Sequence, residues 1–177
     1  TGWLGSAISL ALAEVGFHVV VVSRGVGEDF LTPKNWSDVS ATSEVIVKIS
    51  GDLSSEKGCH EVFDQVTKDR PISVLVNNSF DWPKNVHLAN QNWDDLEKTV
   101  RTGLISPLYM SKLVMGNMKD TGVGGSIINI ASMYGHVSPD FGIYEDSGMG
   151  NAIEYGASKA AILQATRYLA VLGAPHK

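Results

Sequence analysis

Cysteine is almost absent from this chain of 177 residues, which contains a single one, Cys59. One thiol cannot form a disulfide within the chain, so a small fold held by internal disulfides is excluded and a reducing, cytoplasmic location is expected. Long hydrophobic runs are missing as well, because no apolar segment approaches the length of a membrane span. We therefore predict no membrane partner.

Positive charge is also in short supply, with 14 basic against 19 acidic residues and a net charge of −5. This balance argues against nucleic acid as the main partner. The five histidines share no metal-ligand spacing. Cys59 and His60 are adjacent but have no further ligands near them in the sequence, which is more typical of an ordinary helix than of a metal site. With 44% hydrophobic residues, the chain is predicted to form one globular domain over residues 1–177.

A phenol and an ammonium group stand four residues apart, at Tyr155 and Lys159, in a segment of small residues and helix formers. At helical spacing both side chains project from one face, and a neighbouring cation favours the phenolate form of a phenol. A β-rich segment upstream, residues 125–132, ends at Ser132, whose hydroxyl can donate a hydrogen bond to a substrate oxygen. The trio suits reversible proton transfer at an alcohol or ketone, although this spacing alone is also common on solvated helices.

The beginning of the chain has the pattern of a dinucleotide-binding turn. Gly2 and Gly5 precede an apolar segment predicted to be a helix, and glycines at this spacing let the backbone approach a pyrophosphate. Two glycines before a helix are a weak signal alone. A continuous apolar strand over residues 18–24 follows, which is the order of a βαβ unit without its first strand.

Taken in order, these segments resemble the short-chain dehydrogenase/reductase family from the first residue to the last. Within that likeness, Asn77, Asn78 and Ser79 are similar to the NNAG segment of the family. The resemblance implies an α/β fold with a doubly wound parallel sheet, Rossmann-like, with helices on both faces in three αβα layers. The strands expected after the one at residues 18–24 span residues 44–50, 73–79 and 125–132.

The resemblance also implies roles for individual residues. Tyr155 would be the general acid/base, Lys159 would favour the phenolate and hold the nicotinamide ribose, and Ser132 would orient the substrate oxygen. The positions expected at the cofactor are Gly2, Trp3, Leu4 and Gly5 under the pyrophosphate, Asp52 and Leu53 at the adenine, and Asn78, Ser79, Tyr155 and Lys159.

The end of the strand at residues 18–24 bears on cofactor choice. An acidic residue there would bind the ribose 2′-hydroxyl of NAD, but this chain has Ser23 and Arg24. A guanidinium can clamp a 2′-phosphate, so NADP(H) is favoured over NAD(H). The alternative is that Arg24 simply points into solvent.

Two departures from the family concern the site. The best alignment puts Gly103 where the family usually has an asparagine that helps to hold the lysine; a shift of two residues would make Arg101 the neighbour instead. The segment between Ser132 and Tyr155 is long and rich in Gly, Asp and Tyr. It is either a surface loop or a substrate wall suited to hydroxylated, sugar-like molecules, with candidate residues Met133, His136 and Tyr144.

Family members are longer than this chain, so a first strand and a C-terminal substrate segment are expected to be missing. The predicted function is an NADP(H)-dependent oxidoreductase acting on a small secondary alcohol or ketone. The alternatives are a non-catalytic dinucleotide-binding protein, which Gly103 favours, and a sugar-nucleotide epimerase or dehydratase. In the family the helices expected from Trp93 to Met118 and from Tyr155 onward pair between subunits, which predicts a homodimer or homotetramer; simple packing on the sheet is the alternative.

Overall fold

The computed structural model describes residues 2–25, 46–84 and 86–176. The chain forms two compact units, Thr1–Lys68 and Asp69–Lys177. All four predicted strands form, and residues 44 and 45 of the second one lie outside the described residues. In the described ranges, no helix is long and apolar enough to cross a membrane. No cluster of three or more potential metal-binding side chains of the His, Cys, Asp or Glu type occurs there either.

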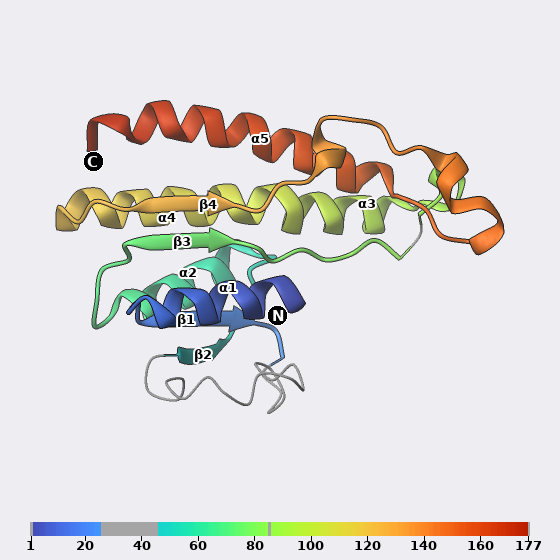
Figure 1. Ribbon diagram of the computed structural model, residues 1–177. Helices are drawn as coiled ribbons and strands as arrows, with labels where there is room; N and C mark the ends of the chain where they lie inside the picture. The colour runs from blue at the N-terminus through green and yellow to red at the C-terminus, as the bar shows by residue number, and fades with distance from the viewer. Residues whose placement is uncertain (1, 26–45, 85, 177) are drawn as a thin grey trace. The chain divides into compact units, whose positions relative to one another are not determined.

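In the first unit, the described residues form two helices and a two-stranded parallel sheet (Figure 1). Along the chain these elements are α1 (Trp3–Glu14), β1 (Val19–Ser23), β2 (Ile46–Ser50) and α2 (Glu56–Thr67). The register pairs Val19 with Ile46 and Ser23 with Ser50. Because side chains alternate along a strand, the same face of β1 carries Val19 and Val21, and both are buried. They form the core of this unit together with Leu10 and Ile46.

Helix α2 begins at a conventional capped end. The Ser55 hydroxyl accepts a hydrogen bond from the backbone amide of Gly58 at 3.1 Å, and Glu56 places a negative charge in the first turn. Both features stabilise a helix N-terminus, the cap by about 1 kcal/mol. The cap thus fixes where α2 starts after the loop that carries Asp52 and Leu53.

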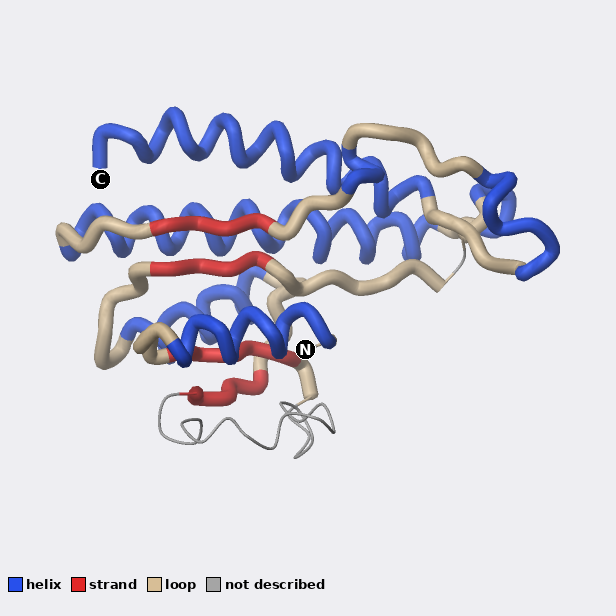
Figure 2. Tube along the Cα trace, viewed as in Figure 1, coloured by secondary structure: helices blue, strands red, loops and turns tan. Residues whose placement is uncertain are grey.

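The second unit contains a second two-stranded parallel sheet and the two longest helices of the described residues (Figure 2). Its elements are β3 (Val74–Asn77), η1 (Leu88–Asn90), α3 (Trp93–Val100), η2 (Arg101–Ile105), α4 (Ser106–Thr121), β4 (Ser126–Asn129), η3 (Met133–Gly135), η4 (Phe141–Ser147), α5 (Ile153–Gly173) and η5 (Ala174–His176).

A chain of side-chain hydrogen bonds ties α4 and α5 to this sheet. Asn77 and Asn129 are register partners, and the Asn77 amide donates to the Asn129 side-chain oxygen at 2.8 Å. The Asn77 amide also lies 3.2 Å from the Ser111 hydroxyl on α4, and the Asn129 amide donates to Thr166 on α5 at 2.9 Å. Both helices are therefore held to the same face of β3 and β4.

The predicted helix from Trp93 onward is confirmed, with a change of winding in its middle. Asn92 caps it by accepting a hydrogen bond from the Asp95 amide at 2.9 Å. Helix α3 then passes through the π-helical turn η2, Arg101–Ile105, into α4, so that the two helices continue one another (Figure 1). A π-turn inserts one residue into the helical ladder, and such turns are frequent at functional sites.

Candidate functional site

The phenol and the ammonium group predicted from the sequence lie in the first two turns of α5. The ammonium nitrogen of Lys159 donates to the backbone oxygen of Ile130 at 2.6 Å and lies 5.8 Å from the centroid of the Tyr155 ring. Lys159 is only 7% exposed, and burial lowers the pKa of its ammonium group below the ordinary value of 10.5. The start of α5 therefore holds a buried cation beside a phenol ring.

Ser132 lies in the turn that follows β4, and two glycines bring this turn against the start of α5. A Cβ added at Gly135 would lie 2.8 Å from the carbonyl carbon of Lys159, and one added at Gly156 would lie 2.9 Å from the carbonyl oxygen of Tyr134. Only glycine permits backbones to approach so closely. The structure thus places the Ser132 turn directly on the helical turns that carry Tyr155 and Lys159.

The Ser132 hydroxyl oxygen accepts a hydrogen bond from the backbone amide of Tyr134 at 3.2 Å. This bond uses a lone pair of the hydroxyl and leaves its hydrogen for donation to another oxygen. Ser132 is therefore held by its own turn in a manner compatible with orienting a substrate oxygen.

Two aromatic residues that the sequence did not single out complete this group. The ring of Phe80 meets the ring of Tyr155 edge to face, with centroids 5.1 Å apart, and the ring of Trp82 lies 4.9 Å from that of Tyr155. The ammonium nitrogen of Lys159 is 5.1 Å from the centroid of Phe80. Two aromatic residues soon after Ser79 could have indicated a site in the sequence. Their contribution to the site, however, depends on contacts with residues far along the chain.

Gly103 lies beside this group of residues. A Cβ at Gly103 would lie 2.7 Å from Cε2 of Phe80 and 3.0 Å from Cβ of Ser158 on α5. Arg101, the alternative, is exposed and forms an ion pair with Glu97 within its own helix. The ring of Phe80 thus occupies the space beside residue 103.

Glu154, next to Tyr155 in the sequence, is a further residue that the sequence pattern did not indicate. It is 3% exposed, and neither of its carboxylate oxygens has a hydrogen-bond partner among the described residues. Ser158, one turn further along α5, has a buried hydroxyl in the same condition. Polar groups of this kind are costly to bury. Both residues lie in the first two turns of α5, as Tyr155 and Lys159 do.

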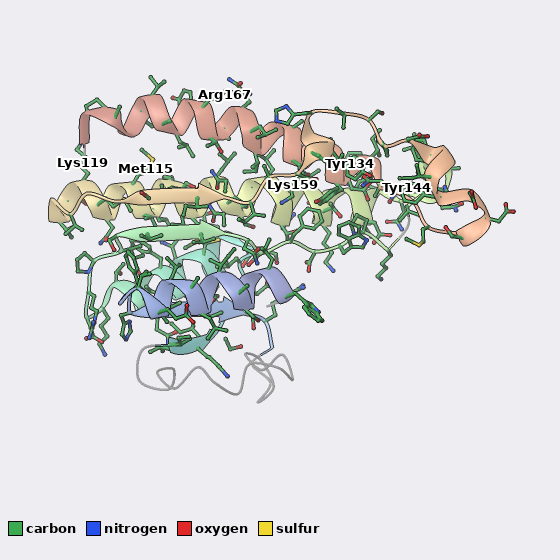
Figure 3. The ribbon with its side chains drawn as sticks, in the orientation of Figure 1. Met115, Lys119, Tyr134, Tyr144, Lys159 and Arg167 are labelled. Carbon is green, nitrogen blue, oxygen red and sulfur yellow. The ribbon has the colours of Figure 1, made fainter. Side chains whose placement is uncertain are left out.

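The three candidate substrate residues lie in the segment between Ser132 and α5. Met133 is 67% exposed, and His136 is also exposed. The Tyr144 hydroxyl lies 3.4 Å from that of Tyr134, and this contact, with a smaller effect of burial, raises the pKa of Tyr144 above its ordinary value. Figure 3 shows Tyr134 and Tyr144 on the side of this unit where Lys159 lies, away from Lys119.

The glycine turn predicted for the cofactor forms the exposed N-terminus of α1 in the first unit. Gly2 is the N-cap residue, no side chain caps the helix, and its first turn contains no acidic residue. A Cβ at Gly2 would meet nothing within 4 Å, Trp3 is 90% exposed and Leu4 is 54% exposed, whereas Gly5 is buried. Backbone amides at such a helix end carry partial positive charge and suit a phosphate group.

The other predicted cofactor residues follow the ends of strands. Ser23 ends β1, its hydroxyl donates to the Gly25 carbonyl at 2.7 Å, and Arg24 is the next residue, with an exposed side chain. Asp52 accepts a hydrogen bond from the Ser54 amide at 3.0 Å in the loop after β2. Leu53, beside it, accepts from the Cys59 thiol. In the second unit Asn78 and Ser79 follow β3 directly.

The sequence of this chain is similar to those of known proteins. The family model described as short chain dehydrogenase matches residues 1–177. A 2-dehydro-3-deoxy-D-gluconate 5-dehydrogenase of Dickeya dadantii is 30% identical, with 98% of this chain and 62% of the relative covered. An L-xylulose reductase of Caenorhabditis elegans is 28% identical, with 94% and 60% covered. The chain therefore spans less than two thirds of the length of these relatives.

Solved structures give the same result for the fold. A crystal structure of the bulky-bulky ketone specific alcohol dehydrogenase from Comamonas testosteroni superposes with a TM-score of 0.75 at 26% identity. The match covers 98% of this chain and 66% of that chain. The doubly wound α/β fold class predicted from the sequence is thereby confirmed.

Proposed function

The chain belongs to the short-chain dehydrogenase family, and from that premise we propose that it is an NADP(H)-dependent oxidoreductase of small secondary alcohols and ketones. The observation that carries the proposal is the start of α5, where Tyr155 and the buried Lys159 lie one turn apart under the Ser132 turn. A protein that only bound a dinucleotide would not need this combination of phenol, ammonium and hydroxyl.

In the reductive direction Tyr155 would donate its phenolic proton to the carbonyl oxygen of the substrate, and in the oxidative direction the phenolate would accept the hydroxyl proton. Lys159 places its positive charge 5.8 Å from the centroid of the Tyr155 ring and would hold the nicotinamide ribose. The Ser132 hydroxyl would donate to the same substrate oxygen and hold it near the phenol. When bound, the nicotinamide cofactor supplies or accepts the hydride.

Each unit contains residues proposed to contact the cofactor. Amides of the first turn of α1, at Gly2 to Gly5, would bind the pyrophosphate. Asp52 with Leu53 would contact the adenine, while Asn78, Ser79, Tyr155 and Lys159 would serve the nicotinamide half. The absence of an acidic residue directly after β1, together with Arg24, supports NADP(H) over NAD(H).

For the substrate we propose a hydroxylated, sugar-derived molecule. The segment after Ser132 offers the hydroxyls of Tyr134 and Tyr144, which lie within hydrogen-bonding distance of each other. Met133, His136 and Tyr144 remain the proposed wall residues. Two relatives of similar sequence are named for a gluconate derivative and for xylulose, which supports the same class.

We further propose a homodimer or homotetramer that uses α4 and α5. Exposed apolar side chains occur on both helices, among them Leu108 on α4 and Tyr168, Val171 and Leu172 on α5. Light scattering coupled to size-exclusion chromatography tests this proposal, which a monomer at micromolar concentration would contradict.

The decisive experiment is turnover with NADPH over a panel of ketoses, keto-sugar acids and simple ketones, compared with the Tyr155→Phe variant. We expect the variant to bind NADPH like the parent chain and to lose a factor of about 10²–10⁴ in kcat, the contribution typical of a general acid or base. A variant that retains turnover would place the proton donor elsewhere. NADPH binding without turnover by the parent chain on any substrate would favour the non-catalytic alternative.

A further inference from the structure

Lys159 is a buried cation with few polar partners. Its ammonium group can donate three hydrogen bonds, and the structure shows one, to the Ile130 carbonyl. Among the described residues, no ion pair includes Lys159. A buried charge needs compensation, so the surroundings of this nitrogen are decisive for where it rests.

The ring of Phe80 provides part of that compensation. The centroid of the Phe80 ring lies 5.1 Å from the Lys159 nitrogen, within the range of a cation–π interaction. The same ring packs edge to face against the ring of Tyr155, with centroids 5.1 Å apart. Trp82 completes the cluster at 6.1 Å from Phe80 and 4.9 Å from Tyr155. One aromatic side chain therefore touches both members of the proton-transfer pair.

The segment that carries Phe80 is held to α3 and η2 by contacts of the next residue, Asp81. The backbone amide of Asp81 donates to the Thr102 hydroxyl at 3.2 Å, and the Asp81 carboxylate lies 3.7 Å from the Lys98 ammonium group. Thr102 directly precedes Gly103, where the ring of Phe80 fills the space that any side chain would take. The location of the ring is thus set by the π-turn as well as by α5.

We infer that Phe80 is a positioning residue, seated by Gly103, whose ring holds the Lys159 ammonium group and the Tyr155 phenol in their working arrangement. The inference rests on the proposed function, because it concerns how the same proton-transfer pair is kept in place. It predicts that residues 80 and 103 are coupled in stability and that the aromatic character of residue 80 affects turnover.

The coupling is tested by a double-mutant cycle with Gly103→Ala, Phe80→Leu and the double variant, followed by melting temperature. Alanine at 103 places a Cβ 2.7 Å from the ring of Phe80 and 3.0 Å from Cβ of Ser158, so we expect a fall of several degrees. The part of that fall caused by the ring should disappear when leucine replaces Phe80. Gly116→Ala is the matched control, because its Cβ would meet nothing within 4 Å. Additive changes in melting temperature would overturn the seating of Phe80 by Gly103.

The positioning role is tested by turnover of Phe80→Leu and Phe80→Tyr. We expect leucine to lower kcat about tenfold, the value of a desolvated cation–π contact, with KM and NADPH affinity changed less than about twofold. Tyrosine, which keeps the ring, should restore most of the loss. Equal kcat values for the leucine and tyrosine variants would overturn the role. The melting-temperature cycle needs no substrate, so its failure is separable from a failure of the proposed activity.

Discussion

Lys159 carries its charge at a position that is 7% exposed, with the Ile130 carbonyl and two aromatic rings as neighbours. Burial disfavours the charged form, which is why its pKa lies below 10.5 in the folded protein. Its ammonium group lies 5.8 Å from the centroid of the Tyr155 ring.

This lowered pKa predicts a pH dependence of stability. Between the folded pKa and 10.5 the unfolded chain binds more protons at Lys159 than the folded chain does. The free energy of unfolding contributed by this residue therefore rises with pH across that window, as the cost of the buried charge is relieved. Lys159→Met removes the titration while keeping an unbranched side chain.

The measurement is urea unfolding of the parent chain and of Lys159→Met at several pH values from 7 to 10.5. We expect the stability of the parent chain, relative to the methionine variant, to increase with pH. A difference that stays constant or decreases would show that burial does not control the titration of Lys159.

At the scale of elements, the contact between η3 and α5 decides where Ser132 lies. The contact depends on Gly156, because a Cβ there would come within 2.9 Å of a backbone oxygen that cannot rotate away. We expect Gly156→Ala to lower the melting temperature by several degrees, from about 1–3 kcal/mol of overpacking. We expect kcat to fall by tenfold or more as the Ser132 turn is displaced.

The control for this prediction is Gly116→Ala in α4, where the added Cβ has open space. Both changes exchange glycine for alanine within a helix, and alanine gains up to about 1 kcal/mol of helix propensity in each. The two variants differ in the close approach alone. Similar melting temperatures and rates for both would contradict the proposed role of Gly156.

Much of the secondary structure was predictable because it follows from local patterns. The apolar runs gave four parallel-type strands, and Asn92 capped its helix as expected. The predicted strands were too long at their ends, where polar residues such as Asn78 and Ser79 leave the ladder. The π-turn around Gly103 was not foreseen, since nothing in its local sequence distinguishes it from a continuous helix.

The site was predictable to the extent that spacing along one element defines it. Tyr155 and Lys159 share a helix, so four residues of separation were enough to bring them together. Phe80 belongs to the site through contacts with Gly103, Tyr155 and Lys159, which come from other parts of the chain. Such contacts depend on tertiary packing, which local propensity does not determine.

At the scale of the whole molecule, the preference for NADP(H) over NAD(H) can be tested by removing a single charge, that of Arg24. Arg24→Ala should weaken NADPH binding about tenfold to a hundredfold, the value of a charge-assisted hydrogen bond to phosphate, and leave NADH nearly unchanged. A ligand that binds only the native state raises the melting temperature, so thermal-shift titrations with each dinucleotide measure this.

Arg167→Ala serves as the matched control, because this exposed arginine lies on α5 and contacts Gln164. It removes the same charge from the molecule and should leave both dinucleotides unaffected. If Arg24→Ala weakens NADPH and NADH equally, Arg24 does not read the 2′-phosphate, and the preference for NADP(H) must be abandoned.

The close approach of Gly103 to Phe80 also restricts which residues these two positions can accept together. A chain with any other residue at 103 already has a Cβ where the ring lies, so it could not accept phenylalanine at 80 without displacing one of the two. Positions 80 and 103 are therefore best varied together, because a side chain at 103 needs a smaller residue at 80 or a displaced ring.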